Sequence, residues 1–186
     1  FDFEKQARLM VNESPLDPNG SDFERALAMW LGDFLETEQG GTFVLFTSYR
    51  QLERVYDLVA PRLERANRFV LRHGGGMGRS QMIELFKATG NAVLFGTSSF
   101  WEGVDVRGDA LKNVIITKIP FEVPNHPLIE ARHNDIKAHG GNPFMERTVP
   151  EAILRLKQGV GRLIRTKQDS GTIILCDHRI KTKAYG

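Results

Sequence analysis

Short, nearly continuous runs of apolar residues recur along the chain. They cover residues 43–46, 69–71, 92–95, 114–116 and 173–176, and a further short run at 7–11 could form another strand. Runs of this length without polar alternation are typical of strands buried on both faces of a parallel sheet. The hydrophobic pattern therefore predicts a mostly parallel central sheet.

Stretches with helical patterning separate these runs. They cover residues 51–63, 80–87, 127–138 and 149–165. Another helix is expected from Ser21 to about residue 35, because Ser21 and Glu24 have capping-box spacing, and Gly40 and Gly41 then end it. Strands that alternate with helices predict a doubly wound α/β fold in three layers, α/β/α.

In such folds ligands gather at the carboxyl ends of the strands. The residues that follow the apolar runs are therefore the first candidates for a site. They are Thr47, Ser48, Tyr49, Arg72, His73, Gly96, Thr97, Ser98, Lys118, Asp177 and His178.

The helix predicted at 149–165 has a marked start and a charged end. Thr148 and Glu151 form a second capping box, which predicts that the helix begins there. Further along, Gln158 and Arg162 are four residues apart and Arg165 follows three later, so all three side chains share one face.

Two glycines lie inside this same predicted helix. Gly159 and Gly161 each cost about 1 kcal/mol relative to alanine, which suggests that something approaches the backbone closely there. Two arginines and an amide on one face suit an anion such as a phosphate chain. The alternative is a solvated basic face at the end of a core helix.

A polar segment follows the apolar run at 92–95. The segment begins with Thr97, Ser98 and Ser99, whose hydroxyl and backbone N–H groups could bind phosphates. Glu102 and Asp105 offer acceptors for ribose hydroxyls, and Gly103 permits close approach. We expect Phe100 and Trp101 to pack inward, with base stacking as the alternative.

One segment resembles a nucleotide-binding loop only in its context. Residues 73–80 follow a predicted strand and open a helix, but His73 stands where the first glycine belongs and Arg79 replaces the lysine. We interpret this segment as a flexible connection. Asp177 ends an apolar run as a magnesium-holding acid would, yet without a phosphate loop we expect it to cap or pair locally.

Composition narrows the function classes. The chain has 186 residues, 41% of them hydrophobic and 26% charged, which favours one domain with a real core. The formal net charge of +2 permits a nucleic-acid partner without establishing one. The lone cysteine, Cys176, excludes an internal disulfide or a multi-cysteine metal site and is expected to be a core thiol.

Metal binding and membrane association are not expected. His126, His133 and His139 form no familiar metal pair. No apolar run reaches membrane-spanning length and the start does not read as a signal peptide, so a cytoplasmic location is the default expectation. Because the chain begins at Phe1, we expect it to be an excised fragment of a larger protein.

Three motifs in fixed order carry a family resemblance. Residues 44–49, 96–105 and 158–165 resemble motifs IV, V and VI of the second motor domain of superfamily-two helicases, which is RecA-like. Ser-Phe-Trp-Glu-Gly-Val-Asp at 99–105 and Gln-x-x-Gly-Arg-x-x-Arg at 158–165 are similar to the DinG/XPD branch. The loop at 120–127 and the ending at 177–186 resemble the bacterial DinG type.

The resemblance covers nearly the whole chain from about residue 43 and, more loosely, the residues before it. It implies one RecA-like domain over residues 1–186, with 1–42 as a lead-in and 43–186 carrying the motifs. It also implies that ATP and magnesium bind between this domain and a first motor domain that is absent here. That first domain would carry the phosphate loop, so the fragment alone is expected to be inactive.

The resemblance assigns roles at the nucleotide. Arg162 and Arg165 would reach the γ-phosphate, and Gln158 would position their helix or the attacking water. The residues implied on the nucleotide side, some of which couple it to DNA, are Glu102, Gly103, Asp105 and Gly161. The family's iron–sulphur cluster, where one is present, uses four cysteines in the first domain, so this fragment is not expected to hold it.

The resemblance also implies a single-stranded DNA partner and a role in DNA repair or replication. The residues implied to contact the DNA backbone are Thr47, Ser48, Tyr49, Thr97 and Ser98. Two alternatives remain at this point. One is a non-enzymatic nucleic-acid-binding domain that kept the fold, although two arginines facing an empty cleft argue against it. The other is an RNA-directed motor of the same superfamily.

Overall fold

Six strands form one sheet in the computed structural model, which describes residues 6–12, 17–97, 100, 106, 110–122, 127–161, 163 and 169–186. The strands are β1 (Ala7–Val11), β2 (Thr42–Leu45), β3 (Val70–Arg72), β4 (Val93–Gly96), β5 (Asn113–Ile116) and β6 (Gly171–Leu175). Their order is β1-β6-β5-β2-β4-β3, and every pair of neighbours is parallel. The predicted parallel sheet, including a strand at residues 7–11, is confirmed.

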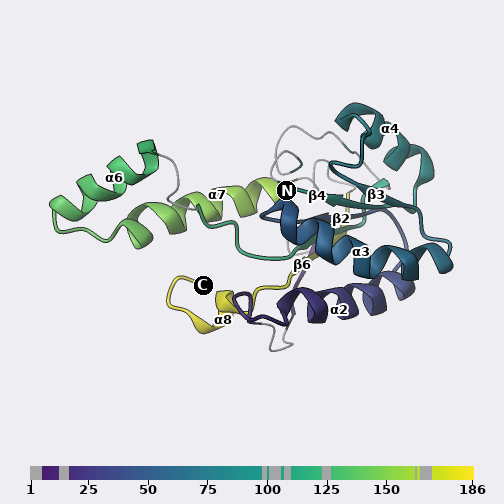
Figure 1. Cartoon of the computed structure of the whole chain (residues 1–186), viewed down its shortest axis with the longest axis horizontal. Coiled ribbons are helices and arrows are strands. Elements are labelled where there is room, and N and C mark those ends of the chain that lie inside the picture. Colours follow the sequence, from purple (N-terminus) through teal and green to yellow (C-terminus); the bar gives the residue numbers. More distant parts are fainter. Residues whose placement is uncertain are drawn as a thin grey trace.

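Helices connect the strands and cover both faces of the sheet (Figure 1). They are α2 (Phe23–Thr37), α3 (Tyr49–Arg65), α4 (Arg79–Thr89), α6 (Pro127–Ala138), the π-helix η2 (Phe144–Thr148), α7 (Val149–Val160) and α8 (Arg179–Thr182). Every predicted helix is present, and most of the predicted helix ends lie within about two residues of those in the structure.

Two hydrophobic clusters, one on each face of the sheet, form the core. Phe43 and Leu45 point into the cluster completed by α4 and the end of α7. Val44 and Phe46 point into the cluster completed by α2 and α3. Because successive side chains of a strand alternate between faces, the unbroken apolar run is needed to fill both layers. The three-layer α/β/α prediction is confirmed.

The predicted capping box at the start of α2 is wrong. The helix begins after Asp22, and no side chain caps its first turn. Glu24, which was expected to bond back to Ser21, forms a salt bridge with Arg54 of α3 at 3.0 Å instead. The Glu24 carboxylate therefore pairs with a neighbouring helix instead of capping its own, as the local sequence pattern had predicted.

The second predicted capping box is also wrong, because the helix starts earlier. Thr148 has helical backbone angles and makes no capping bond. The cap is Asn142, whose Oδ1 accepts from the N–H groups of Phe144 at 3.1 Å and Met145 at 3.3 Å. Glu146 bonds back to the Asn142 N–H at 2.7 Å. The π-turn of η2 adds a residue, so the acidic partner lies four positions after the cap rather than three.

The prediction that this helix runs to residue 165 is wrong as well. α7 ends at Val160, and the Leu163 N–H bonds to the Val160 carbonyl at 3.0 Å, which makes a turn. The Leu163 side chain is buried beside Gly171, where any Cβ would lie 2.7 Å from Leu163 Cδ1. Leu163 therefore packs beside the first residue of β6. Arg162 and residues 164–168 lie outside the described part.

One part of the molecule projects from the sheet. We call residues 127–155, which contain α6, η2 and the first half of α7, the arm (Figure 1). No residue of α6 is buried. The second half of α7 returns to the sheet, where Leu156 and Val160 pack against the core.

Candidate functional site

The carboxyl edge of the sheet brings together residues that follow different strands. β2 lies between β4 and β5, so Thr47, Thr97 and Thr117 come to neighbouring positions. The Thr117 hydroxyl donates to the Leu45 carbonyl at 3.0 Å and ties the ends of β5 and β2 together. Because neighbouring strands are all parallel, the residues that follow them lie at one edge of the sheet.

The segment after β2 is the most open part of this edge. Thr47, Ser48 and Tyr49 are exposed, and Tyr49 is the first residue of α3. Ser48 has extended backbone angles and caps the helix, since its Oγ accepts from the Gln51 N–H at 3.3 Å. The first turn of α3 thus faces the edge, and a helix N-terminus favours a negative charge.

His73 connects three segments of the edge. The Tyr49 hydroxyl lies 2.8 Å from His73 Nε2, and the Thr97 hydroxyl lies 2.9 Å from His73 Nδ1. The ring of Phe100 packs edge-on against the imidazole, with 4.8 Å between centroids. Burial, and to a lesser extent the charge of Arg79, lower the pKa of His73 and so favour its neutral imidazole.

Sequence reasoning missed this bridging role of His73. It noted His73 only as a residue that follows a strand and as a misfit in a nucleotide-binding loop. The available signal was its place directly after β3, which pairs with β4 and so brings His73 beside Thr97. Thr97 is only 3% exposed. Its hydroxyl therefore orients His73, and through it Tyr49, rather than lying open on the surface.

At the other end of the edge a buried ion pair follows β6. Asp177 is fully buried and accepts from Arg179 Nε at 2.8 Å, from Arg179 Nη2 at 2.6 Å and from the Ile119 N–H at 2.9 Å. Burial opposes ionisation, but these hydrogen bonds outweigh it and hold the pKa of Asp177 below its usual range. The prediction that Asp177 pairs locally is confirmed.

The residues assigned to the nucleotide lie only partly in the described structure. Gln158 and Gly161 are exposed at the end of α7, whereas Gly159 between them is buried. Phe100, as predicted, is packed in the core, and so is Val106. The predicted site residues outside the described part are Ser98, Glu102, Gly103, Asp105, Arg162 and Arg165.

Neither a metal centre nor a membrane segment is found among the described residues. No three His, Cys, Asp or Glu side chains within them are arranged to hold a metal ion. Cys176 is buried, as predicted, and burial raises the pKa of its thiol. Of the helices that these residues form, none combines the length and apolar character needed to cross a membrane.

Residues 31–186 match the family model of the helicase C-terminal domain. The chain belongs to this family. Over its whole length it is 41% identical to the ATP-dependent DNA helicase YoaA of Escherichia coli K12. It is 44% identical over 192 aligned residues to the ATP-dependent DNA helicase DinG of Photobacterium profundum. It spans 29% of the first relative's length and 27% of the second's.

Solved structures with this helicase C-terminal domain fold include XPD helicases. One XPD helicase superposes on 94% of the chain with a TM-score of 0.69 at 19% identity, and the chain covers 32% of that structure. Xpd4 of S. tokodaii gives a TM-score of 0.67 over 95% of the chain at 17% identity, and 35% of that structure is covered. The predicted RecA-like fold and the resemblance to the DinG/XPD branch are both confirmed.

Proposed function

We propose that this chain works as the second motor domain of an ATP-dependent DNA helicase of the DinG/XPD type. The observation that carries the proposal is its 41% identity, across all 186 residues, to a relative named an ATP-dependent DNA helicase. We further propose that residues 1–186 form one domain. The pairing of β1 with β6 supports this, because it places residues 7–11 in the same sheet as the motifs.

At the nucleotide we assign Arg162 and Arg165 to the γ-phosphate. Two guanidinium groups suit charge that develops on phosphoryl oxygens, and such arginines act mainly in the transition state. The exposed Gln158 at the end of α7 would position the attacking water. Leu163, which lies between the two arginines in sequence, is itself buried in the core.

The remaining nucleotide contacts are assigned to the segment after β4 and to the end of α7. Glu102 and Asp105 would accept hydrogen bonds from ribose hydroxyls, while Gly103 and the exposed Gly161 leave room for close approach. ATP with magnesium supplies the phosphoryl group when bound. The phosphate loop, the magnesium ligand and any iron–sulphur cluster would belong to a first motor domain.

We assign the open carboxyl edge to the sugar–phosphate backbone of single-stranded DNA. Thr47 is exposed there, and Ser48 accepts from the Gln51 N–H, which leaves its own O–H free to donate to a phosphate. Tyr49 would lie against the strand, oriented by His73 and Thr97. Ser98 completes the proposed set. Such contacts are independent of base sequence and sensitive to salt.

The test is steady-state ATP hydrolysis by the intact protein with single-stranded DNA, single-stranded RNA or no nucleic acid. We expect DNA to stimulate turnover most and the isolated chain of 186 residues to hydrolyse no ATP. Stimulation by RNA that equals or exceeds that by DNA would replace the proposal with an RNA-directed motor. An intact protein that binds DNA without hydrolysing ATP would indicate a non-enzymatic binding domain.

We also propose that the helicase acts in DNA repair or replication.

A further inference from the structure

Three aromatic side chains from distant parts of the chain meet where the arm joins the body. Phe121 follows β5, Phe144 opens η2 and Tyr185 follows α8. The ring centroids lie 5.2 Å apart for Phe121 and Phe144, and 5.4 Å apart for each of these rings and Tyr185. We call these three residues the aromatic cluster. None of the sequence motifs includes the cluster as a unit.

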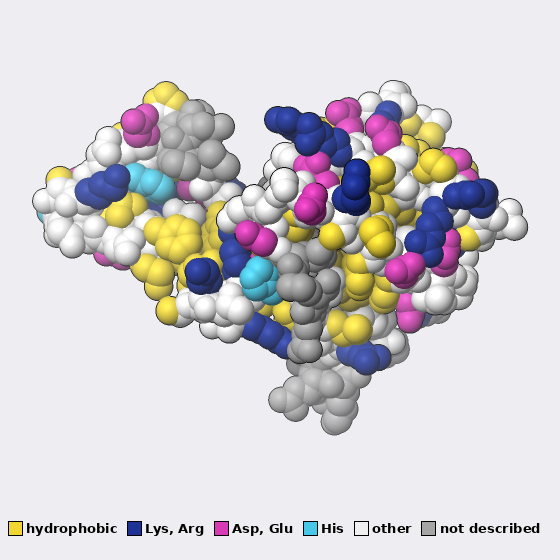
Figure 2. Space-filling model, turned by 60° about the horizontal axis from the view of Figure 1, so that its bottom comes forward, with side chains coloured by type: hydrophobic (Ala, Val, Ile, Leu, Met, Phe, Trp, Pro, Cys, Tyr) yellow, Lys and Arg dark blue, Asp and Glu magenta, His cyan; other side chains and the backbone are white. Residues whose placement is uncertain are grey.

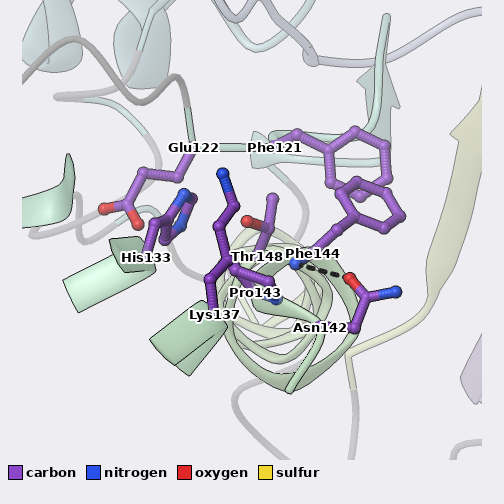
Figure 3. Close-up of a pocket in the computed structure, with 8 residues that line it drawn as sticks. All are labelled: Phe121, Glu122, His133, Lys137, Asn142, Pro143, Phe144 and Thr148. Carbon is purple, nitrogen blue, oxygen red and sulfur yellow. Dashed lines mark hydrogen bonds between the residues drawn. The ribbon is translucent and has the colours of Figure 1, made fainter. Parts of the chain in front are cut away.

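A cavity of about 350 Å³ lies beside the aromatic cluster (Figure 3). Phe121 and Phe144 form one wall, and Lys137 extends between His133 and Thr148 into the opposite side (Figure 3). Small-molecule pockets have volumes of about 300–1,000 Å³, so the cavity can accept a group the size of a single nucleobase.

The cluster leaves part of its apolar surface open to solvent. Phe144 is 38% exposed and its neighbour Met145 is 43% exposed. Phe144 also opens a π-helix, an uncommon geometry that is frequent at functional sites. Hydrophobic side chains lie open in the recess between arm and body, with Lys and Arg beside them (Figure 2).

The charges near the cluster favour a polyanion. Residues 178–186 contain no acidic residue. Arg179 is paired with Asp177, whereas Lys181 and Lys183 are exposed. The acid that lines the cavity, Glu122, is offset by two arginines, Arg147 at 3.6 Å and Arg155 at 3.5 Å. Aromatic rings bordered by cations are the usual elements of a surface that binds single-stranded nucleic acid.

We propose that the aromatic cluster and its cavity bind a nucleobase of single-stranded DNA by stacking, with Lys137 and Lys183 near the flanking phosphates. This inference rests on the proposed DNA function and adds a base contact to the backbone contacts of the carboxyl edge. We expect the stacking to tolerate any base. Every base has a face that can stack.

The test compares two oligonucleotides of equal length and charge, one of mixed sequence and one without bases. Equilibrium binding of each is measured with the intact protein and its variants. Phe144→Ala should weaken binding of the base-containing strand about 10-fold and leave binding of the abasic strand unchanged. Phe144→Trp should retain affinity. Met29→Ala, which alters an exposed methionine on α2 away from the arm, should bind both strands as the wild type does.

A second variant tests the charges separately. Lys183→Gln should weaken both strands alike and reduce the dependence of log affinity on log salt by about one unit. If Phe144→Ala weakens both strands equally, or neither, the stacking site is overturned while the DNA function stands. If the wild-type protein binds no single-stranded DNA, the DNA function itself fails and this inference fails with it.

Discussion

Arg179 binds the carboxylate of Asp177 with two hydrogen bonds, Nε to Oδ1 at 2.8 Å and Nη2 to Oδ2 at 2.6 Å, although Asp177 is fully buried. The Ile119 N–H donates to the same carboxylate at 2.9 Å. This pair holds the end of β6 to the segment that follows β5, from which Phe121 and Glu122 enter the aromatic cluster and the cavity.

Asp177→Asn should destabilise the fold by about 3 kcal/mol, because it removes the charge that compensates Arg179 and weakens the remaining hydrogen bonds. Urea unfolding followed by circular dichroism measures the change. Asp135→Asn is the matched control, since Asp135 is exposed on α6 and its loss should change stability by less than about 0.5 kcal/mol. Equal effects of the two substitutions would show that the buried pair contributes nothing.

The same pair predicts how stability depends on pH. The pKa of an aspartate in the unfolded chain is about 3.9, and the pKa of Asp177 in the folded protein is lower. Between these two values the unfolded chain binds more protons than the folded one. The stabilisation by Asp177 is therefore complete above about pH 4 and is lost as the pH falls through the folded pKa. Unfolding free energies measured from pH 7 to pH 3 should fall more steeply for the wild type than for Asp177→Asn.

Gly41 occupies a position that admits no side chain. A Cβ there would lie 1.8 Å from the Ala110 carbonyl oxygen, which is backbone and cannot rotate away. Gly41→Ala should therefore destabilise by about 2–4 kcal/mol, in the range of overpacked cores and strained backbones. At Gly78 an added Cβ meets nothing within 4 Å, and its φ of −63° suits any residue. Gly78→Ala should change stability by less than about 1 kcal/mol, and the reverse ranking in thermal unfolding would refute the steric account.

Thr47 offers the cleanest test of the proposed backbone contacts. Ser48 caps α3 and Thr97 supports His73, so substitutions there would also alter structure. Thr47 is exposed, and Thr47→Val keeps its shape while it removes the hydroxyl. Loss of one hydrogen bond should weaken single-strand binding by about 3- to 10-fold, and equally on poly-dT and mixed sequences. A loss confined to one sequence would indicate that Thr47 reads bases.

The strands could be predicted from sequence because their signal is local. The runs around Val44 and Ile115 are apolar throughout, and a strand with both faces buried requires that pattern. The helix starts could not be predicted from sequence in the same way. Which side chain caps a helix depends on contacts with residues far along the chain. Glu24 bonds to Arg54 rather than to its own helix, and the π-turn moves the second cap to Asn142.

Some features of the candidate site could also be predicted from the sequence, and others could not. The rule that ligands meet the carboxyl ends of parallel strands was enough to select Thr47 and Thr97. Which of them is open to solvent depended on packing, since Thr97 is covered and bonded to His73. The aromatic cluster had no sequence signal, because Phe121 and Tyr185 lie far apart in the chain and meet only when β5 and β6 pair.

The central claim is that this domain supplies arginines to the γ-phosphate of ATP, and the most direct test measures turnover beside nucleotide affinity in the intact protein. Arg162→Ala and Arg165→Ala should each lower kcat at least about 10²-fold while the Kd for ATP changes far less, because such arginines act mainly in the transition state. Lysine should rescue poorly, since it lacks the planar fork. Lys157→Ala, at an exposed position of α7, is the control and should keep normal turnover. Near-normal kcat in both arginine variants would contradict the account and leave this segment as an ordinary solvated basic surface.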